Sequence, residues 1–172
     1  MELTERGLSF FSLFESITGV MPKDFSELDE MIVFIIDPDK MGKAIGKKGA
    51  NIAKLKAKFK KKVFVVSDAD TPENFIRNFF NNINVLNIEE RTVMNEKSFL
   101  IYVEEQARGL AVGHNGERIK ILKDFLKKKF NATAHIRTKR ILTVGKSEED
   151  KNTEDENKNN EDQDNAEVAE SG

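Results

Sequence analysis

A glycine-containing segment that occurs twice constrains the fold of this chain more than any other feature. The segment GKAIGKKGANI at residues 42–52 recurs 67 residues later as GLAVGHNGERI at residues 109–119. An apolar run precedes each copy, at 32–36 and at 99–103, and an acidic residue closes each run. Self-similarity at a fixed period indicates repeated structural units, and here it predicts two copies of one small domain.

The repeat divides the chain into two expected domains followed by a tail. We predict a first domain at residues 1–70, a second at 71–145 and a tail at 146–172. The tail contains three Lys and eleven Asp or Glu residues, a net charge of −8, so the rest of the chain carries +6 of the total of −2. Because Val168 is its single bulky apolar residue, the tail cannot bury enough surface to offset the entropy of ordering, and we predict that it is disordered.

Composition argues against several classes of protein. The chain has no Cys, which excludes disulfides and thiolate metal sites, and its two His residues are too few for a dedicated zinc site. The longest apolar run, at 31–36, is six residues long and far too short to span a membrane. We therefore expect a soluble, cytoplasmic protein that uses no metal, cofactor or membrane.

Periodicity predicts the same order of elements, α-β-β-α-loop-α-β, in each copy. The first copy is expected to form a helix at 4–18 that stops at Gly19, a strand near 25–28, a strand at 31–36 covered on both faces, a short helix ending at Ile45, an amphipathic helix after Gly49 and a strand at 63–66. The second is expected to form a helix with Phe75, Ile76, Phe79, Phe80 and Ile83 on one face, a strand at 85–94, a hairpin turn at 95–96, a strand at 99–103, a short helix at 106–112, a longer helix through 119–130 and a strand at 133–143. We expect Asp37 or Asp39 to cap the first short helix, and Thr71 to cap a helix that Pro72 begins. The predicted fold class is α+β.

Each repeated segment places a Gly-x-x-Gly turn between a short helix and a longer amphipathic one. The turns are Gly46-Lys47-Lys48-Gly49 and Gly113-His114-Asn115-Gly116. Glycine lets another backbone approach closely, and the amides and dipole at the start of the following helix favour a phosphate. The first turn adds two cations, whereas the second offers no fixed charge. This arrangement is typical of the KH module, whose loop clamps the backbone of single-stranded nucleic acid.

The two loops resemble the tandem KH pair of NusA-family transcription factors, in particular the short archaeal NusA-like proteins. I-G-K-K-G-x-N-I and its second form V-G-H-N-G-x-x-I carry the resemblance, which covers about residues 3–145. It implies two tandem type II (prokaryotic) KH domains packed together, each a three-stranded sheet covered by helices. It also implies binding of single-stranded RNA in transcription termination or antitermination. RNA polymerase and other transcription factors stay open as partners, because the polymerase-binding and S1 domains of bacterial NusA have no counterpart in this pattern.

We predict that RNA contacts come from the two loops and from the helix positions beside them. In the first copy these residues are Ile45, Gly46, Lys47, Lys48, Gly49, Asn51, Ile52 and Lys54. In the second copy they are Val112, Gly113, His114, Asn115, Gly116, Arg118 and Ile119. The bases are expected to lie between the basic helix and the last strand of each copy, beside Val65 or Ile136. We expect no aromatic stacking platform, because the single Tyr, Tyr102, belongs to a core strand, and we expect His135 to be structural.

Two other classes of function are compared with RNA binding. Neither loop fits the phosphate-loop or dinucleotide-binding pattern, and no nucleophile, base or carboxylate pair accompanies them, so we predict no enzyme activity. The remaining alternative is a KH-scaffold protein in RNA processing or ribosome assembly that acts mainly through protein contacts. A salt-dependent affinity for single-stranded RNA would distinguish RNA recognition from scaffolding. We expect a monomer.

Overall fold

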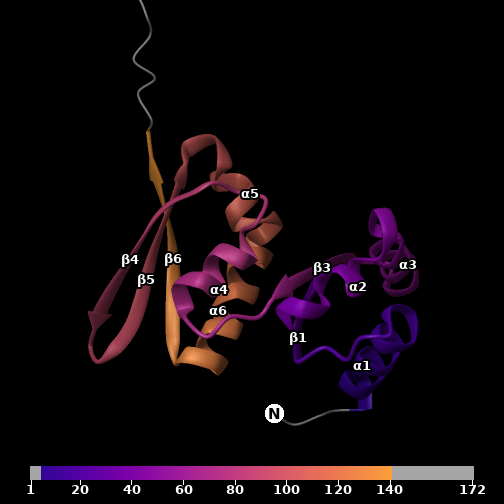
Figure 1. The fold of residues 1–172 in the computed structure, drawn as a ribbon. Helices are drawn as coiled ribbons and strands as arrows, with labels where there is room; N and C mark the ends of the chain where they lie inside the picture. The colour runs from indigo at the N-terminus through magenta and orange to yellow at the C-terminus, as the bar shows by residue number, and fades with distance from the viewer. Residues whose placement is uncertain (1–4, 141–172) are drawn as a thin grey trace, which may run out of the picture. The chain divides into compact units, whose positions relative to one another are not determined.

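The computed structural model describes residues 5–140 as two modules in succession, each with one three-stranded sheet (Figure 1). The first module contains α1 (Glu5–Thr18), β1 (Asp24–Leu28), β2 (Met31–Ile36), η1 (Pro38–Lys40), α2 (Met41–Ile45), η2 (Lys47–Gly49), α3 (Ala50–Phe59) and β3 (Lys62–Ser67). The second contains α4 (Pro72–Phe79), β4 (Val85–Val93), β5 (Glu96–Glu104), η3 (Glu105–Ala107), α5 (Arg108–Val112), η4 (His114–Gly116), α6 (Glu117–Phe130) and β6 (Ala132–Lys139). The predicted α-β-β-α-α-β order is confirmed in both modules. The predicted tail and the end of the predicted last strand lie outside the described residues.

The two sheets have the same topology. In the first sheet the order is β1-β2-β3, with β1 antiparallel and β3 parallel to the central strand β2. In the second sheet β4, β5 and β6 repeat this order and these directions. A parallel pair needs a long crossover connection, which α2 with α3, or α5 with α6, supplies. The strand orders place the parallel strands β3 and β6 at one edge of their sheets.

Strand β2 is buried along its whole length and contributes to two different hydrophobic cores. Ile32, Phe34 and Ile36 pack with residues of the first module's helices, such as Phe14 and Leu55. The alternate residues Met31, Val33 and Ile35 pack in one cluster with residues of the second module, including Phe75, Ile121 and Phe125. Successive side chains of a strand point to opposite faces, so the helices cover one face and the second module covers the other. The prediction of a strand covered on both faces is confirmed.

Two ion pairs link β3 of the first module to opposite ends of α6. Lys62 Nζ lies 3.2 Å from the Oε1 atom of Glu117, at the start of both elements. Lys129, near the end of α6, pairs with Asp68, which directly follows β3. The spacings match, since six strand residues span about 20 Å and twelve helical residues about 18 Å. The Glu117 side chain is 1% exposed, so its carboxylate is shielded from solvent, whereas the Lys62 side chain is 55% exposed.

Asp68 joins lysines from both modules. Its carboxylate accepts a hydrogen bond from Lys23 at 2.9 Å in addition to the bond from Lys129. Partial burial by itself would raise the pKa of Asp68, but the hydrogen bonds from Lys129 and Lys23 outweigh burial and hold that pKa below its ordinary value. The pKa of Lys23 is raised by its hydrogen bonds to Asp37 and Asp68. The ionised carboxylate of Asp68 therefore stabilises the segment between the modules.

The structure confirms one predicted helix cap and corrects another. The hydroxyl of Thr71 accepts a hydrogen bond from the Asn74 amide at 3.3 Å, as predicted. Neither Asp37 nor Asp39 makes the predicted capping bond at the first short helix. The Asp37 carboxylate pairs instead with Lys23 at 2.8 Å, because a nearby ammonium is the stronger partner for a carboxylate than a neutral amide.

Two predicted boundaries in the second module were also wrong. The hairpin turn lies at Met94 and Asn95, one residue earlier than predicted, and both residues have positive φ, 50° and 65°. Two left-handed residues are what a tight two-residue hairpin requires. Helix α4 ends at Phe79, so Phe80 and Ile83 are buried in the core beyond the helix and not on its face.

We predict that Asp68→Asn makes the free energy of unfolding less dependent on acid pH. Because the folded pKa of Asp68 is lowered, its stabilising effect is present above about pH 4 and is lost as pH falls through the folded pKa. The wild-type melting temperature should therefore fall more steeply from pH 5 to pH 2 than that of the variant. Thermal melts across this range test the prediction, with the exposed Asp70→Asn as the matched control. Parallel curves for wild type and Asp68→Asn would contradict it.

Candidate nucleic-acid interface

The two Gly-x-x-Gly loops have the same backbone conformation. Gly46 and Gly113 have φ of 75° and 80° with ψ of 170° and 172°. The third residue of each loop, Lys48 or Asn115, is left-handed, with φ of 53° or 50°. The last glycine is left-handed in both loops and directly precedes α3 or α6. The sequence repeat thus corresponds to a repeat of local structure.

Asn51 explains why the first loop position accepts only glycine. A Cβ atom on Gly46 would lie 2.8 Å from the Asn51 side chain, in a backbone region that L residues rarely adopt. The Asn51 carboxamide donates a hydrogen bond of 3.0 Å to the carbonyl oxygen of Lys43 in α2. Asn51, predicted as an RNA contact, therefore ties the start of α3 to α2 and holds the loop between them.

Arg118 occupies the same repeat position in the second module and makes the equivalent bond. Its guanidinium donates to the Leu110 carbonyl in α5 at 3.3 Å, and a Cβ atom on Gly113 would lie 2.8 Å from its own Cβ. It also donates to the Phe79 carbonyl at 3.2 Å and to the Asn82 side chain at 2.6 Å. The residue is 5% exposed, and burial lowers the pKa of its guanidinium. Because protein oxygens already bind this guanidinium, it is not available to bind a phosphate.

The cations of the first loop are free to meet a ligand. Lys47, Lys48 and Lys54 are exposed, and within residues 5–140 their ammonium groups have no ion pair or hydrogen bond. Ile52 and Val65 are partly buried and pack against the first module's core. Ile45 is also partly buried. The start of α3 thus combines unpaired positive charge with apolar side chains.

The second loop has a cation that the sequence analysis missed. His114 and Asn115 are exposed, and the ammonium of Lys120 donates a hydrogen bond of 3.1 Å to the Asn115 carbonyl. Its position four residues after Gly116 is the signal, because that spacing returns the side chain to the first turn of α6. The partly buried Ile119 and Ile136 pack against the core that includes the second module, and Val112 is also partly buried. With Lys120 beside it, the second loop therefore has more positive charge near it than His114 and Asn115 alone provide.

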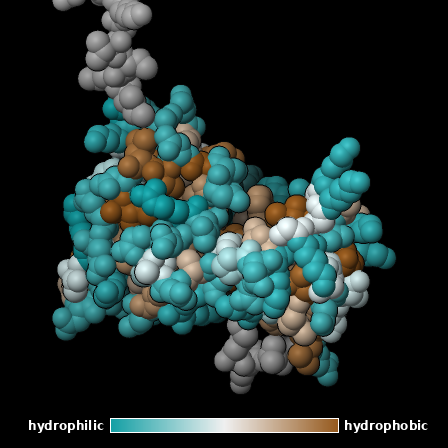
Figure 2. Space-filling view, in the orientation of Figure 1, coloured by the Kyte–Doolittle hydropathy of each residue, from teal (hydrophilic) through white to brown (hydrophobic). Residues whose placement is uncertain are grey.

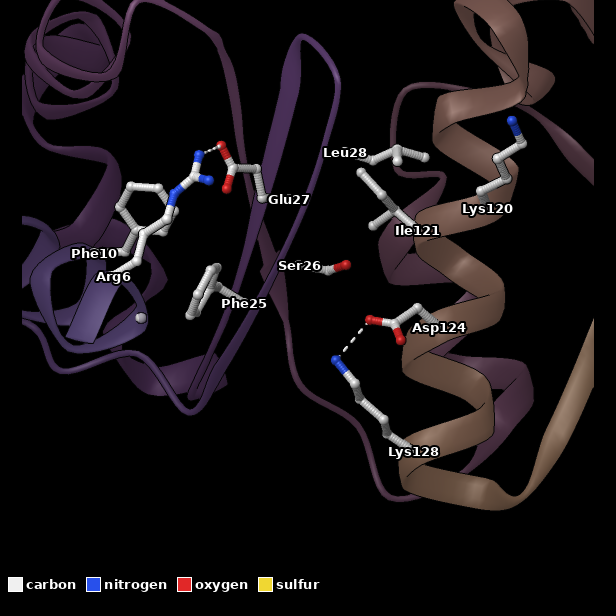
Figure 3. Close-up of a pocket in the computed structure, with 11 residues that line it drawn as sticks. Arg6, Phe10, Phe25, Ser26, Glu27, Leu28, Lys120, Ile121, Asp124 and Lys128 are labelled. Atoms are coloured by element: carbon white, nitrogen blue, oxygen red, sulfur yellow. Dashed lines mark hydrogen bonds and ion pairs between the residues drawn. The ribbon is translucent and has the colours of Figure 1, made fainter. Parts of the chain in front are cut away.

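A groove of about 540 Å³ lies between α1 with β1 and the side of α6 (Figure 3). Phe10, Phe25 and Ile121 contribute apolar surface to it. Four of its five charged side chains form pairs, Arg6 with Glu27 at 2.9 Å and Lys128 with Asp124 at 2.6 Å. The fifth, Lys120, has no ion pair within residues 5–140. Figure 2 shows mixed hydrophilic and apolar side chains on the face in view. Within the described residues, the groove therefore offers a phosphate chain one cation without an ion pair, Lys120, which belongs to the end of the groove nearest the second loop.

Residues 5–140 contain no group of three or more His, Asp or Glu side chains arranged to hold a metal ion. No helix in the same range is long and apolar enough to cross a membrane.

Comparisons with known proteins agree with the repeat and the fold. A family model described as "KH domain" matches residues 31–79, which run from β2 through the first loop to the end of α4. A Methanocaldococcus jannaschii protein named "Probable transcription termination protein NusA" is 31% identical over 127 residues, covering 72% of this chain and 69% of its own. Proteins of the same name from Methanococcus vannielii and Halococcus morrhuae are 29% and 28% identical, covering 69% and 75% of this chain and 69% and 92% of their own.

A solved structure has a similar arrangement of elements. The structure titled "Crystal structure of APE1850" superposes with a TM-score of 0.64 at 29% identity. The superposition covers 78% of this chain and 99% of that one. The tandem KH fold predicted from the repeat is therefore confirmed.

We predict that the glycines of the first loop differ in their tolerance of alanine. Gly46→Ala should lower the free energy of unfolding by more than about 2 kcal/mol, because it adds both backbone strain and the contact with Asn51. Gly49→Ala should cost about 1–2 kcal/mol, since its φ is positive but the space is open. Gly42→Ala, in α2 with open space, is the control and should be neutral or stabilising. Equal free energies of urea unfolding for Gly46→Ala and Gly42→Ala would contradict the predicted strain at Gly46.

Proposed function

This chain belongs to the family of archaeal NusA-like KH proteins, and from that premise we propose that it binds single-stranded RNA through both Gly-x-x-Gly loops. The observation that carries the proposal is the first loop, where Lys47 and Lys48 are exposed and have no partner among residues 5–140, directly before the first turn of α3. The names of the relatives support a role in transcription termination at the level of the family. We propose no catalytic step.

In the first module, the RNA backbone passes over Gly46 and Gly49, where side chains do not obstruct its approach. The positive end of the α3 dipole and the ammonium groups of Lys47, Lys48 and Lys54 then attract phosphate oxygens. Bases lie against the apolar side chains of Ile45, Ile52 and Val65, beside the edge strand β3. Asn51 acts by holding the loop in place.

In the second module, Gly113 and Gly116 provide the same backbone passage at the start of α6. His114 and Asn115 donate hydrogen bonds, and Lys120 supplies the positive charge from the first turn of α6. Val112, Ile119 and Ile136 provide the apolar wall for the bases, by the same positions as in the first module. One copy of the chain carries both loops, so a monomer is sufficient for this function.

We place the boundary between the two KH domains at residues 70 and 71, in the segment between β3 and α4. The packing of both modules in one core supports a single RNA-binding body with two clamps. A continuous RNA strand that engages both clamps then gains affinity, because the second contact is intramolecular. A folded protein without RNA affinity would favour the scaffold function in RNA processing or ribosome assembly.

We predict that Lys47→Asp with Lys48→Asp abolishes binding at the first loop without unfolding the protein. The turn is exposed and its glycines are kept, so the far-ultraviolet circular dichroism should stay native. The slope of log affinity against log salt should flatten by about one or more, at roughly 0.7 per single-strand phosphate. Fluorescence anisotropy with random-sequence single-stranded RNA measures the affinity and its dependence on salt. Lys56→Asp with Lys58→Asp, the same charge change farther along α3, should have a smaller effect, and equal effects would argue against the clamp.

We predict that Lys120→Gln flattens the same salt slope by about 0.7, because one phosphate contact is lost. The amide keeps most of the side chain, so the melting temperature should change little. Lys127→Gln is the control, since Lys127 lies near the other end of α6 and pairs with Glu96. An unchanged slope for Lys120→Gln in the same titration would remove Lys120 from the second clamp.

A further inference from the structure

Phe64 is an aromatic residue exposed on β3 that belongs to neither core. Its neighbours Val63 and Val65 point into the first module's core, so alternation directs Phe64 to the opposite face. That face is covered by the second module elsewhere, yet Phe64 stays 36% exposed and joins neither hydrophobic cluster. Core packing therefore does not explain a phenylalanine at this position.

The ring lies beside a small recess where the two modules meet. Phe64, Phe79, Asn81 and Arg118 line this recess, whose volume is about 50 Å³. The Arg118 guanidinium carbon lies 5.8 Å from the Phe64 ring centroid, and its hydrogen bonds to the second module hold it there. Asn81 is exposed, and its carboxamide has no hydrogen-bond partner within residues 5–140. The recess thus has an aromatic wall and an unused amide, but it is too small to enclose a nucleotide.

The position of Phe64 relates it to both loops. Val65, the next residue, is on the strand that borders the proposed first groove. Lys62 and Phe64 contact Glu117 and Arg118, which directly follow the last glycine of the second loop. Phe64 therefore lies on β3 between the strand edge of the proposed first groove and the start of α6 at the second loop.

We propose that Phe64 is a stacking platform for one unpaired nucleobase of the bound RNA, at the junction of the two modules. The base stacks on the exposed ring, and its edge reaches the carboxamide of Asn81, which can donate and accept hydrogen bonds. Stacking accepts any base, and the amide suits either a purine or a pyrimidine edge, so this subsite adds affinity with little sequence preference. The inference rests on the proposed RNA binding and adds a contact outside both loops.

The second module offers a matched control for this position. Phe64 pairs with Val33 in the first sheet, and His135 pairs with Leu100, the residue 67 positions after Val33, in the second. His135 is exposed on the equivalent face of β6, but within the described residues no further loop follows it. A substitution of His135 therefore removes a ring from the equivalent position of the second sheet, which does not lie between the two loops.

The first experiment measures RNA affinity by fluorescence anisotropy with random-sequence single-stranded RNA. Phe64→Leu keeps an apolar side chain and should weaken binding roughly five- to 150-fold, the range of one lost base–aromatic stack. Phe64→Tyr should keep the wild-type affinity, because it retains the aromatic ring. His135→Leu should change the affinity less than Phe64→Leu does. Equal effects of Phe64→Leu and His135→Leu, or wild-type affinity of Phe64→Leu, would overturn the stacking site. The proposed function would survive that result if Lys47→Asp with Lys48→Asp still weakened binding and flattened its salt dependence.

The second experiment uses the wild-type chain, so that it does not depend on the folding of a variant. RNA containing 5-iodouridine is bound and irradiated, because this base crosslinks preferentially to aromatic rings on which it stacks. Mass spectrometry of the digested complex should identify a crosslink at Phe64. Crosslinks at other residues with none at Phe64 would refute the platform while leaving RNA binding intact. Absence of RNA binding by the wild type would refute the proposed function and this inference with it.

Discussion

The burial of β2 on both faces is the constraint on which the rest of the structure depends. A strand with apolar residues at every position cannot expose either face to water without a large cost. The first module's helices cover only the face of Ile32, Phe34 and Ile36. The face of Met31, Val33 and Ile35 is covered by the second module. The two modules therefore share a hydrophobic core and are not independent domains joined by a linker.

This shared core relates the two loops in space. Helix α6, which begins directly after the second loop, is held to β3 of the first module by Lys62–Glu117 and Lys129–Asp68. The start of α6, next to the second loop, is therefore held in place relative to the first sheet. In the proposed function, binding of one RNA by both loops then requires little reordering of the protein, which lowers the entropic cost of association.

Asn51 and Arg118 illustrate how a repeat can keep geometry while its residues take on different additional contacts. Both occupy the same position after the loop, and both donate a hydrogen bond to the preceding short helix. Asn51 reaches no farther, whereas the longer Arg118 also binds the end of α4 and lies near the Phe64 ring. The difference follows from side-chain length, because Arg118 is long enough to reach Phe79 in its own module and the Phe64 ring of the first.

The sequence by itself determined the repeat, the order of elements, the glycine loops and the two-sided burial of β2, because these depend on backbone conformation and on short-range periodicity. Its errors at the Asp37 cap and the Met94–Asn95 turn were also local, where a competing lysine or a one-residue shift changed the outcome. Only the tertiary structure decided that Arg118 is buried and that Phe64 stays exposed. Burial and partners depend on which distant element covers a side chain, and no pattern within one strand or helix encodes that.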